Sequence, residues 1–238
     1  DILFNGSQYL FSTDGTAGTF DVQDVLSHEI GHLVGLDHAP QISGTLWPYV
    51  STSQWLHRSL TTDDRSGAIA VAPEGTQSRL TGTIQRASDS SAISGAIVSA
   101  ISVADGRLIG MAASTSSGAF TIRGVPEGSY WVHVTPLEGG MTSGNLTGNA
   151  TVHTDFTAGF YGSFAAPTSF NVTAGNSTAC GTLAMGSDIV MKDSANAAVV
   201  LRRGQAAIVT IFGTGFTAGQ MDIVAKSSEL TVTSVSSA

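Results

Sequence analysis

Residues 21–38 read DVQDVLSHEIGHLVGLDH, and the local structure of this stretch decides how the rest of the sequence is interpreted. Apolar residues recur at helical spacing, which predicts an amphipathic helix over 22–34. Asp21 is the expected N-cap, and Asp24 lies in the first turn near the positive end of the helix dipole. Gly35 ends the predicted helix, because glycine readily adopts the positive φ that a tight reversal needs.

Three histidines and one glutamate in this stretch have a spacing that suits a metal site. His28 and His32 are four residues apart, so both imidazoles lie on one face of the helix. After Gly35 the chain turns, and His38 is placed to reach the same ion. Three neutral imidazoles with an open fourth position are typical of a catalytic zinc site. Glu29 is displaced around the helix, so it contacts a metal-bound water without occupying the metal.

In such a site the pKa of the bound water falls to about 7, and the zinc ion polarises a substrate carbonyl. Glu29 would take the proton of that water and later deliver it to the leaving amine. The spacing therefore indicates metal-assisted hydrolysis, with His28, His32 and His38 as ligands and Glu29 as general base.

Composition narrows the class of protein. Only 12% of the 238 residues are charged, against about 25% in an average soluble protein, and Gly, Ser, Thr and Ala take their place. This composition is typical of extracellular β-sheet modules. The net charge of −8 and the lack of any basic run exclude a nucleic-acid surface. No apolar run is long enough for a membrane span. Cys180, the single cysteine, excludes an intrachain disulfide and is expected to be a small buried apolar residue.

The pattern of the chain divides it into three regions. A second helix is predicted directly after 61–64, with Pro73 and Gly75 closing it. From about Arg79 to Met185 apolar residues alternate with polar ones, which indicates β-strands. Turn signals separate these strands at 105–106, 117–118, 126–128 and 139–140. Short strands at regular intervals predict an antiparallel sandwich.

The predicted fold class is therefore multidomain. We expect an α+β segment over 1–75, a β-sandwich over 78–186 and a partial Ig-like β domain over 187–238. Residues 1–5 have the pattern of the middle of a strand, and the chain is expected to be a piece of a longer protein.

The motif HExxHxxGxxH at 28–38, with its flanks, resembles the matrixin branch of the metzincins, which are zinc metallopeptidases. Residues 21–25 are similar to the entry of the family's zinc-binding helix, 45–49 to its Met-turn and 59–69 to its closing helix. The resemblance implies the C-terminal part of an α+β catalytic domain. It also implies zinc ligands at His28, His32 and His38, the general base Glu29, and a substrate-pocket wall that includes Pro48 and Tyr49.

Two departures from the family pattern affect what this chain is expected to do. Leu46 stands at the Met-turn position, where it keeps an apolar floor under the zinc but lacks the sulfur. The helix and most of the strands that precede this point in the family are absent, so the apolar helix faces would lack their cover. The fragment alone is therefore expected to bind zinc without being a competent peptidase.

The β region carries two further resemblances. Residues 79–137 resemble the carboxypeptidase-regulatory-like (transthyretin-like) sandwiches, through 82–84, 94–98, 117–122 and 128–134. The chain after about 186 resembles the start of an Ig-like IPT/TIG module. Both resemblances imply a fold and carry no chemistry.

Two functions from different classes follow. The first is a secreted or cell-surface zinc metalloendopeptidase that acts on protein or peptide substrates, with sandwiches that serve as spacers or make extracellular-matrix or cell-surface contacts. The alternative is a surface adhesion or binding protein that carries a degenerate, inactive metallopeptidase remnant, which Leu46 and the β-rich majority of the chain favour.

The other polar residues of note are expected to have structural roles. Calcium ligands are conceivable at Asp14 and at 63–64, but neither shows a full oxygen-ligand loop, and turn and helix-cap roles are favoured. His57, His133 and His153 are expected to be surface residues outside any site.

Overall fold

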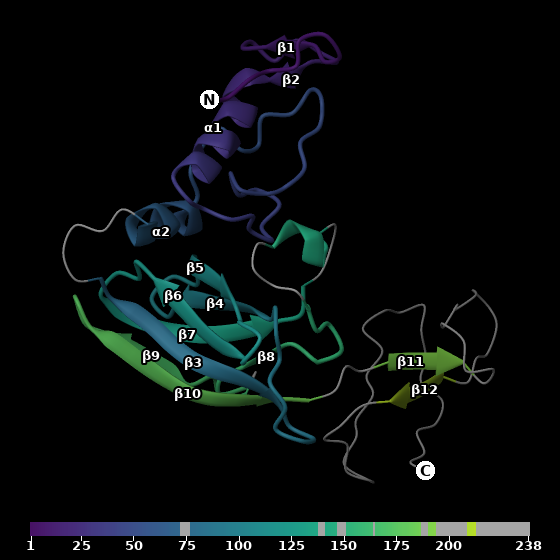
Figure 1. Cartoon of the computed structure of the whole chain (residues 1–238). Helices are drawn as coiled ribbons and strands as arrows, with labels where there is room; N and C mark the ends of the chain where they lie inside the picture. Colours follow the sequence, from purple (N-terminus) through teal and green to yellow (C-terminus); the bar gives the residue numbers. More distant parts are fainter. Residues whose placement is uncertain are drawn as a thin grey trace.

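The computed structural model describes residues 1–71, 77–137, 141–146, 151–163 and 165–186, together with the strands at 190–193 and 209–212. Over these residues a helical segment stands on one end of a two-sheet β structure (Figure 1). The chain is therefore mostly β, with two short α-helices near its beginning, in the order predicted from the sequence.

The helical segment contains α1 (Val22–Leu33), α2 (Thr62–Val71) and a two-stranded parallel pair, β1 (Phe11–Ser12) and β2 (Phe20–Asp21). The side chain of Asp21 accepts a 2.8 Å hydrogen bond from the backbone N–H of Asp24, so the predicted N-cap and helix start are confirmed.

The apolar surface of α1 is largely uncovered, as the sequence predicts. Ile30, Leu33 and Val34 are 44%, 70% and 49% exposed. The expected strand at residues 1–5 is wrong: these residues pair with no strand of the described chain, and Leu3 is 91% exposed. Without a neighbouring strand the backbone has no ladder to join, and the N–H of Gly6 instead bonds the carbonyl of Phe4 in a local turn.

Two sheets form the β structure. The first has the order β10-β3-β6, with β10 parallel and β6 antiparallel to β3. The second has the order β5-β4-β7-β8, and β9 also pairs with β7. The strands are β3 (Arg79–Arg86), β4 (Ile97–Ser102), β5 (Leu108–Ala113), β6 (Ala119–Arg123), β7 (Gly128–Thr135), β8 (Gly159–Phe160), β9 (Ser169–Val172) and β10 (Ser177–Met185).

The core lies between these sheets and follows the predicted alternation. In β7, Tyr130, Val132 and Val134 are buried, while the residues between them are only partly covered. Leu80 and Ile122 face them from the other sheet and are fully buried. The arrangement is that of a sandwich, in which each strand gives one face to the core. Cys180 on β10 is half-buried against this core, so it is less enclosed than expected.

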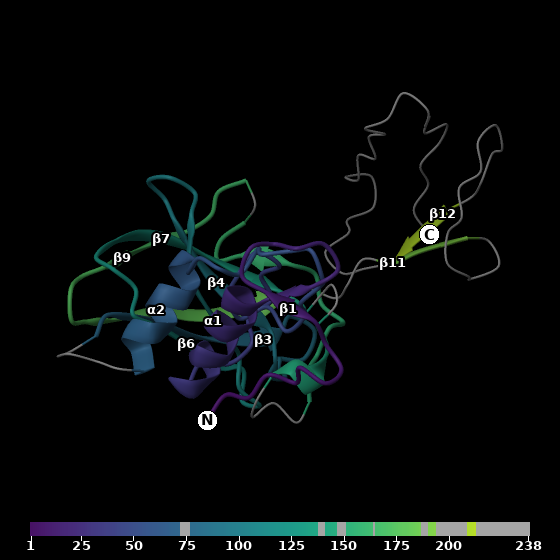
Figure 2. The ribbon, with the colours of Figure 1, turned by 90° about the horizontal axis from the view of Figure 1, so that it is seen from above.

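The helix α2 packs directly on the sandwich at strands β5 and β6 (Figures 1 and 2). The hydroxyl of Ser66 donates to the carbonyl of Ile109 at 2.8 Å, and the backbone N–H of Met111 donates to Oδ1 of Asp63 at 2.6 Å. The helical segment is therefore seated on the sandwich through buried polar contacts.

A short 3-10 helix, η1 (Ser143–Asn145), lies in the connection between β7 and β8, close to the helical segment in Figure 1. Near the end of the chain, β11 (Val190–Asp193) pairs antiparallel with β12 (Val209–Phe212). The rest of the predicted Ig-like unit lies outside the described residues. Within the described chain, neither α-helix has the length and apolarity needed to cross a membrane.

Candidate metal centre

The three histidines of the motif converge on one point. Nε2 of His32 lies 3.0 Å from Nε2 of His28 and 3.2 Å from Nε2 of His38. Three ligand nitrogens around a tetrahedral zinc ion, each about 2.0–2.1 Å from the metal, would lie about 3.3 Å apart. Within the described chain these residues are the group of three or more His, Cys, Asp or Glu side chains that is arranged to hold a metal ion.

Each of the three rings is held by a hydrogen bond at its other nitrogen. Nδ1 of His28 contacts the carbonyl of Thr45 at 2.8 Å, Nδ1 of His32 that of Leu36 at 2.9 Å, and Nδ1 of His38 that of Asn145 at 2.9 Å. A carbonyl oxygen only accepts, so Nδ1 carries the proton in every ring and Nε2 presents its lone pair. Such bonds orient metal-ligating histidines, and the donor set therefore fits a zinc ion.

The helix and the reversal after it place these rings. His28 and His32 lie one turn apart on α1. Gly35 then has φ +100°, the positive value that the sequence predicted for a tight reversal. The N–H of Leu36 bonds the carbonyl of Gly31 at 3.0 Å, which closes the turn and brings His38 back to the helix.

Leu46 forms the floor of the site. Its side chain is 2% exposed and packs against the backbone of α1 at Gly31, between His28 and His32. A Cβ at Gly31 would lie 2.8 Å from one methyl of Leu46, so this contact leaves no room for a larger residue on the helix. The carbonyl of Leu46 also accepts from the N–H of Ala39 at 3.0 Å, which joins the floor to the segment that carries His38.

A cavity of about 100 Å³ opens beside the centre on the side of Glu29. Glu29 and His28 line it together with Pro48 and Tyr49, the two residues expected in a substrate-pocket wall. Trp47 supports the wall, because its ring meets that of Tyr49 edge-on at 5.8 Å. Four of the predicted site residues therefore line this cavity, whereas His38 and Leu46 border a second cavity on the other side of the centre.

The sequence interpretation of His57 is wrong. This residue is 5% exposed; its Nδ1 lies 3.2 Å from Oδ2 of Asp24, and its Nε2 lies 2.9 Å from the carbonyl of Ile42. Its backbone N–H also donates to Asp24, which is 1% exposed. His57 therefore fixes the segment after the Leu46 floor to the first turn of α1, and it also lines the cavity of Glu29. No local signal marks this role, since its partner is 33 residues away.

The other two histidines outside the motif are also less free than expected. His133 is half-buried and lies against Phe160 with ring centroids 4.4 Å apart, and burial lowers its pKa. Nδ1 of His153 accepts from the N–H of Ser94 at 3.0 Å. Within the described chain, no hydrogen bond or ring contact joins His133 or His153 to the three converging histidines.

The surroundings of His28 favour a neutral ring. Burial lowers the pKa of His28, and this effect prevails although the hydrogen bond to the carbonyl of Thr45 opposes it. Asp14 and Asp64 have the predicted turn and cap roles, whereas Asp63 instead accepts from the N–H of Met111 on β5. Asp14 accepts from the N–H and hydroxyl of Thr16, and Asp64 accepts from those of Thr61.

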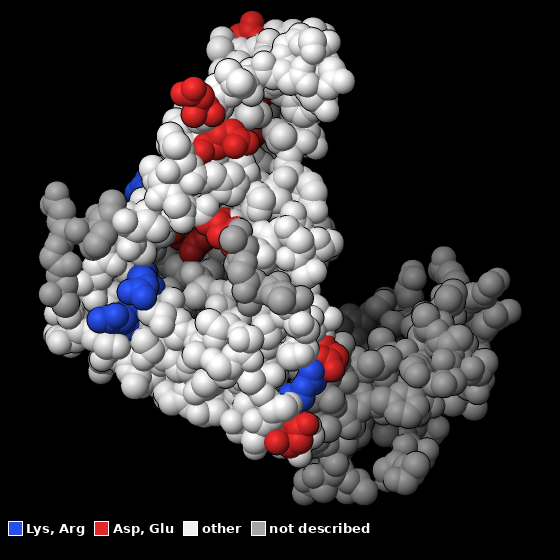
Figure 3. All heavy atoms as spheres, in the orientation of Figure 1, with Lys and Arg blue, Asp and Glu red and all other residues white. Residues whose placement is uncertain are grey.

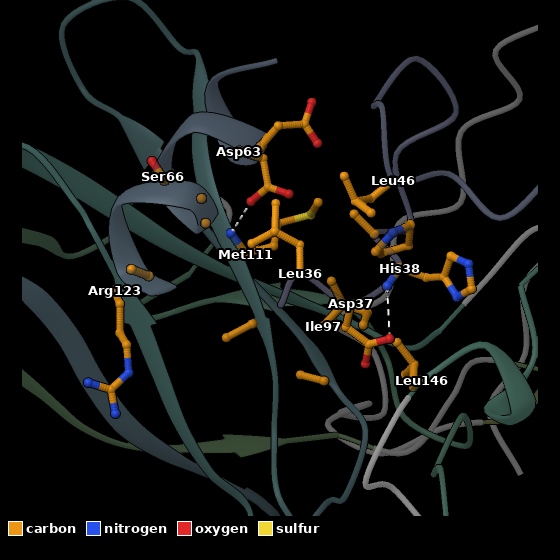
Figure 4. Close-up of a pocket in the computed structure, with 18 of the residues that line it drawn as sticks. Leu36, Asp37, His38, Leu46, Asp63, Ser66, Ile97, Met111, Arg123 and Leu146 are labelled. Carbon is orange, nitrogen blue, oxygen red and sulfur yellow. Dashed lines mark hydrogen bonds between the residues drawn. The ribbon is translucent and has the colours of Figure 1, made fainter. Parts of the chain in front are cut away.

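A larger cavity of about 230 Å³ lies where the helical segment meets the sandwich (Figure 4). His38 and Leu46 border it from the metal side, Asp63 borders it from α2, and Ile97 and Leu146 belong to the sandwich region. Figure 3 shows acidic atoms inside a hollow at this junction. The metal centre is therefore adjacent to the contact between the two parts of the chain.

Comparison with known proteins agrees with this site. Residues 1–71 match the family model of the matrixins (Peptidase_M10). This part of the chain is matrixin-like, and it contains all the residues that converge on the metal centre. The matrixin family is zinc-dependent, and the three histidines form a group that could bind a metal ion. No curated protein matches the chain by sequence.

Solved structures similar to this chain include pilus proteins. Two are forms of BcpA, the major pilin subunit of Bacillus cereus. The D312A form has a TM-score of 0.30 and 14% sequence identity over 46% of this chain. The other form has a TM-score of 0.28 and 12% sequence identity over 49% of this chain. The backbone protein of group B streptococcus pilus 2b has a TM-score of 0.24 and 11% identity over 47% of this chain. The chain spans 30%, 31% and 41% of these proteins, respectively, and similarity at this level carries no functional argument.

Proposed function

We propose that this chain carries the catalytic centre of a zinc metalloendopeptidase. The observation that carries the proposal is the convergence of Nε2 of His28, His32 and His38, with Glu29 at the edge of an adjoining cavity. The matrixin match over residues 1–71 supports the same class of enzyme.

In this mechanism the chain's own residues bind, orient and move protons. His28, His32 and His38 would hold the zinc ion through Nε2, and the hydrogen bonds at Nδ1 keep the rings from rotating. The bound ion supplies Lewis-acid chemistry, which acidifies water and polarises the peptide carbonyl. The carboxylate of Glu29 removes the proton of the attacking water and delivers it to the amine that leaves.

The small cavity supports a role in substrate binding. Glu29 lies on its rim beside Pro48 and Tyr49, so a substrate side chain held there would place the next peptide bond close to the general base. Trp47, Val25 and Val50 add apolar surface to the lining, which also includes the polar residues Asp24 and His57. Protein or peptide segments are therefore the proposed substrates.

Glu29→Gln tests the mechanism in the intact protein. The amide retains the shape of the carboxylate but does not accept a proton, so cleavage of casein should fall by roughly 10²–10⁴-fold. Zinc content, measured by atomic absorption, should stay at one ion per chain. His32→Ala is the matched control on the same helix face, and it should lose the ion as well as the activity. Unchanged proteolysis by Glu29→Gln would contradict the proposed mechanism.

The same measurement separates the enzyme from the alternative of a surface protein with an inactive remnant. The β-rich majority of the chain favours that alternative, and so does Leu46 at the Met-turn position. A wild-type protein that holds no zinc near neutral pH would support the remnant. Zinc-loaded protein with chelator-sensitive cleavage would support the enzyme.

Secretion or attachment to the cell surface is part of the proposal. The low content of charged residues and the β-sandwich are typical of extracellular modules. Matrix or cell-surface contacts through the β domains are proposed on the same basis.

A further inference from the structure

His38, the third ligand of the proposed zinc site, differs from the other two in where the carbonyl that holds its ring comes from. The carbonyls that hold His28 and His32 belong to Thr45 and Leu36, inside the matrixin-like segment. The carbonyl that holds His38 belongs to Asn145, which lies 107 residues further along the chain, in the connection between two sandwich strands. One of the three ring orientations therefore depends on the sandwich.

The side chain of Asn145 fixes the shape of the segment that presents this carbonyl. Its Oδ1 accepts from the N–H and the hydroxyl of Thr142 at 2.8 and 3.1 Å, and the N–H of Asn145 bonds the carbonyl of Thr142 at 2.9 Å. The hydroxyl of Tyr49 also donates to Oδ1, at 3.3 Å. Asn145 thus links the η1 turn, the pocket wall and the metal ligand.

Apolar contacts seat the same segment against the sandwich. Met141 and Leu146 are 5% and 8% exposed, and they form a small buried cluster with Ile97 and Leu137. Trp47, next to the Leu46 floor, packs on this cluster from the helical segment. Leu146 also borders the larger cavity together with His38. The position of Asn145 is therefore set by packing on both sides of the junction.

We propose that residues 141–146 of the sandwich are a structural part of the metal centre, with Asn145 as a positioning residue that orients His38 for zinc. The sandwich then completes the site, in contrast to the spacer role expected from the sequence. This inference rests on the proposed zinc binding, and it adds a residue outside the matrixin-like segment to the site.

Asn145→Ala in the whole chain tests the inference without relying on activity. The substitution removes the acceptor for Thr142 and Tyr49, so the η1 turn loosens and the carbonyl no longer holds His38. Loss of such a supporting hydrogen bond typically lowers metal affinity 10–100-fold, and we expect a loss of about tenfold in zinc competition against a chelator of known affinity. Asn145→Asp keeps the acceptor and should retain most of the affinity.

Nuclear magnetic resonance of the zinc-loaded chain gives a second readout. The Nδ1–H of His38 should lose its protection from exchange in Asn145→Ala, while those of His28 and His32 should keep theirs, because their acceptors are unchanged. Asn176→Ala is the matched control: the side chain of this exposed asparagine donates to the carbonyl of Ala174 in its own turn, at 3.2 Å, and its backbone carbonyl, which accepts from the N–H of Arg79, is retained. It should leave zinc affinity and the His38 signal unchanged.

The outcomes separate the inference from the proposed function. Wild-type chain that binds no zinc would overturn both. Wild-type zinc binding with unchanged affinity and an unchanged His38 signal in Asn145→Ala would overturn the inference alone. If Asn145→Ala does not fold by circular dichroism, Tyr49→Phe replaces it. This variant removes one donor to Asn145, so a smaller loss of affinity supports the inference, and no loss together with an unchanged His38 signal contradicts it.

Discussion

Gly35 has a backbone conformation that few other residues adopt without strain. Its φ of +100° reverses the chain between His32 and His38, and a Cβ there would meet only Val71, at an ordinary 3.8 Å. The requirement for glycine is therefore conformational. A side chain at this position would move His38 away from its partners, because the strain is relieved most easily by opening the turn.

Gly35→Ala should destabilise the chain by about 1–3 kcal/mol, the typical cost of a strained left-handed residue, and should weaken zinc binding. Chemical unfolding and zinc competition measure the two effects. Gly18→Ala is the control, since Gly18 has φ +80° and open space around its Cβ position. It should show a similar strain with no change in zinc affinity. A normal zinc affinity for Gly35→Ala would show that the reversal does not position His38.

Leu46 stands where the family pattern has a methionine. Its buried side chain packs against Gly31, and this packing requires an apolar side chain but no sulfur atom. Leu46→Met should change the free energy of unfolding by less than about 1.5 kcal/mol, because the two side chains have similar volumes. Leu46→Ala should lower it by about 2–5 kcal/mol, because a cavity would open under the helix. Urea unfolding of the zinc-free chain compares the variants. Equal stability for all three would contradict the proposed floor.

At the scale of elements, helix α1 and the strands of the sandwich could be predicted from the sequence because their signals are local. Asp21 lies three residues from the N–H that it caps, and the alternation in β7 extends over neighbouring residues. His28, His32 and His38 could be predicted for the same reason, since a stretch of eleven residues contains them all.

The roles of His57 and Asn145 could not be predicted, because each depends on a partner far along the chain. His57 meets Asp24 across 33 residues, and Asn145 meets His38 across 107. The prediction of a strand at residues 1–5 was wrong for a related reason. A strand needs a neighbouring strand to pair with, and the sequence pattern does not specify one. Local patterns therefore predicted the three histidines that converge, and missed the residues that orient and surround them.

Helix α2 introduces a pH dependence through Asp63. Burial against β5 raises its pKa from 3.8 to about 7, although the hydrogen bond from Met111 opposes the shift. Between these values the unfolded chain has lost the proton of Asp63 while the folded chain retains it. The folded state binds more protons there, so stability should fall as the pH rises from about 4 to about 7.

Asp63→Asn should remove this part of the pH dependence. The amide oxygen still accepts from the N–H of Met111, but the side chain has no charge to desolvate. Thermal unfolding of both proteins from pH 4 to pH 8 measures the difference between their slopes. Asp89→Asn, at an exposed turn, is the control for the loss of one carboxylate. Parallel pH profiles for wild type and Asp63→Asn would refute the assignment.

At the scale of the whole molecule, Gly124 controls how closely α2 approaches the sandwich. It has φ +66°, and a Cβ there would lie 2.4 Å from the carbonyl oxygen of Ser66. Gly124→Ala should therefore push α2 outward, lower the unfolding temperature and weaken zinc binding by displacing Asn145 from His38. Gly106→Ala is the control, because Gly106 has φ +71° but nothing near its Cβ position. Zinc affinity that stays normal in Gly124→Ala would show that the junction does not influence the metal centre.

The hydrogen bond between His38 and Asn145 has a consequence for the topology of the folded chain. A metal ion held by the three histidines alone closes a loop of eleven residues, from His28 to His38, whereas the bond from His38 to Asn145 adds a connection between residues that are 107 positions apart. The entropic cost of closing a loop increases only with the logarithm of the loop's length. Closing the long loop between His38 and Asn145 therefore costs little more than closing a short one. Metal binding and sandwich docking would then be thermodynamically coupled. Chelation should weaken docking of the sandwich on the helical segment, and undocking should weaken zinc binding by the same coupling free energy.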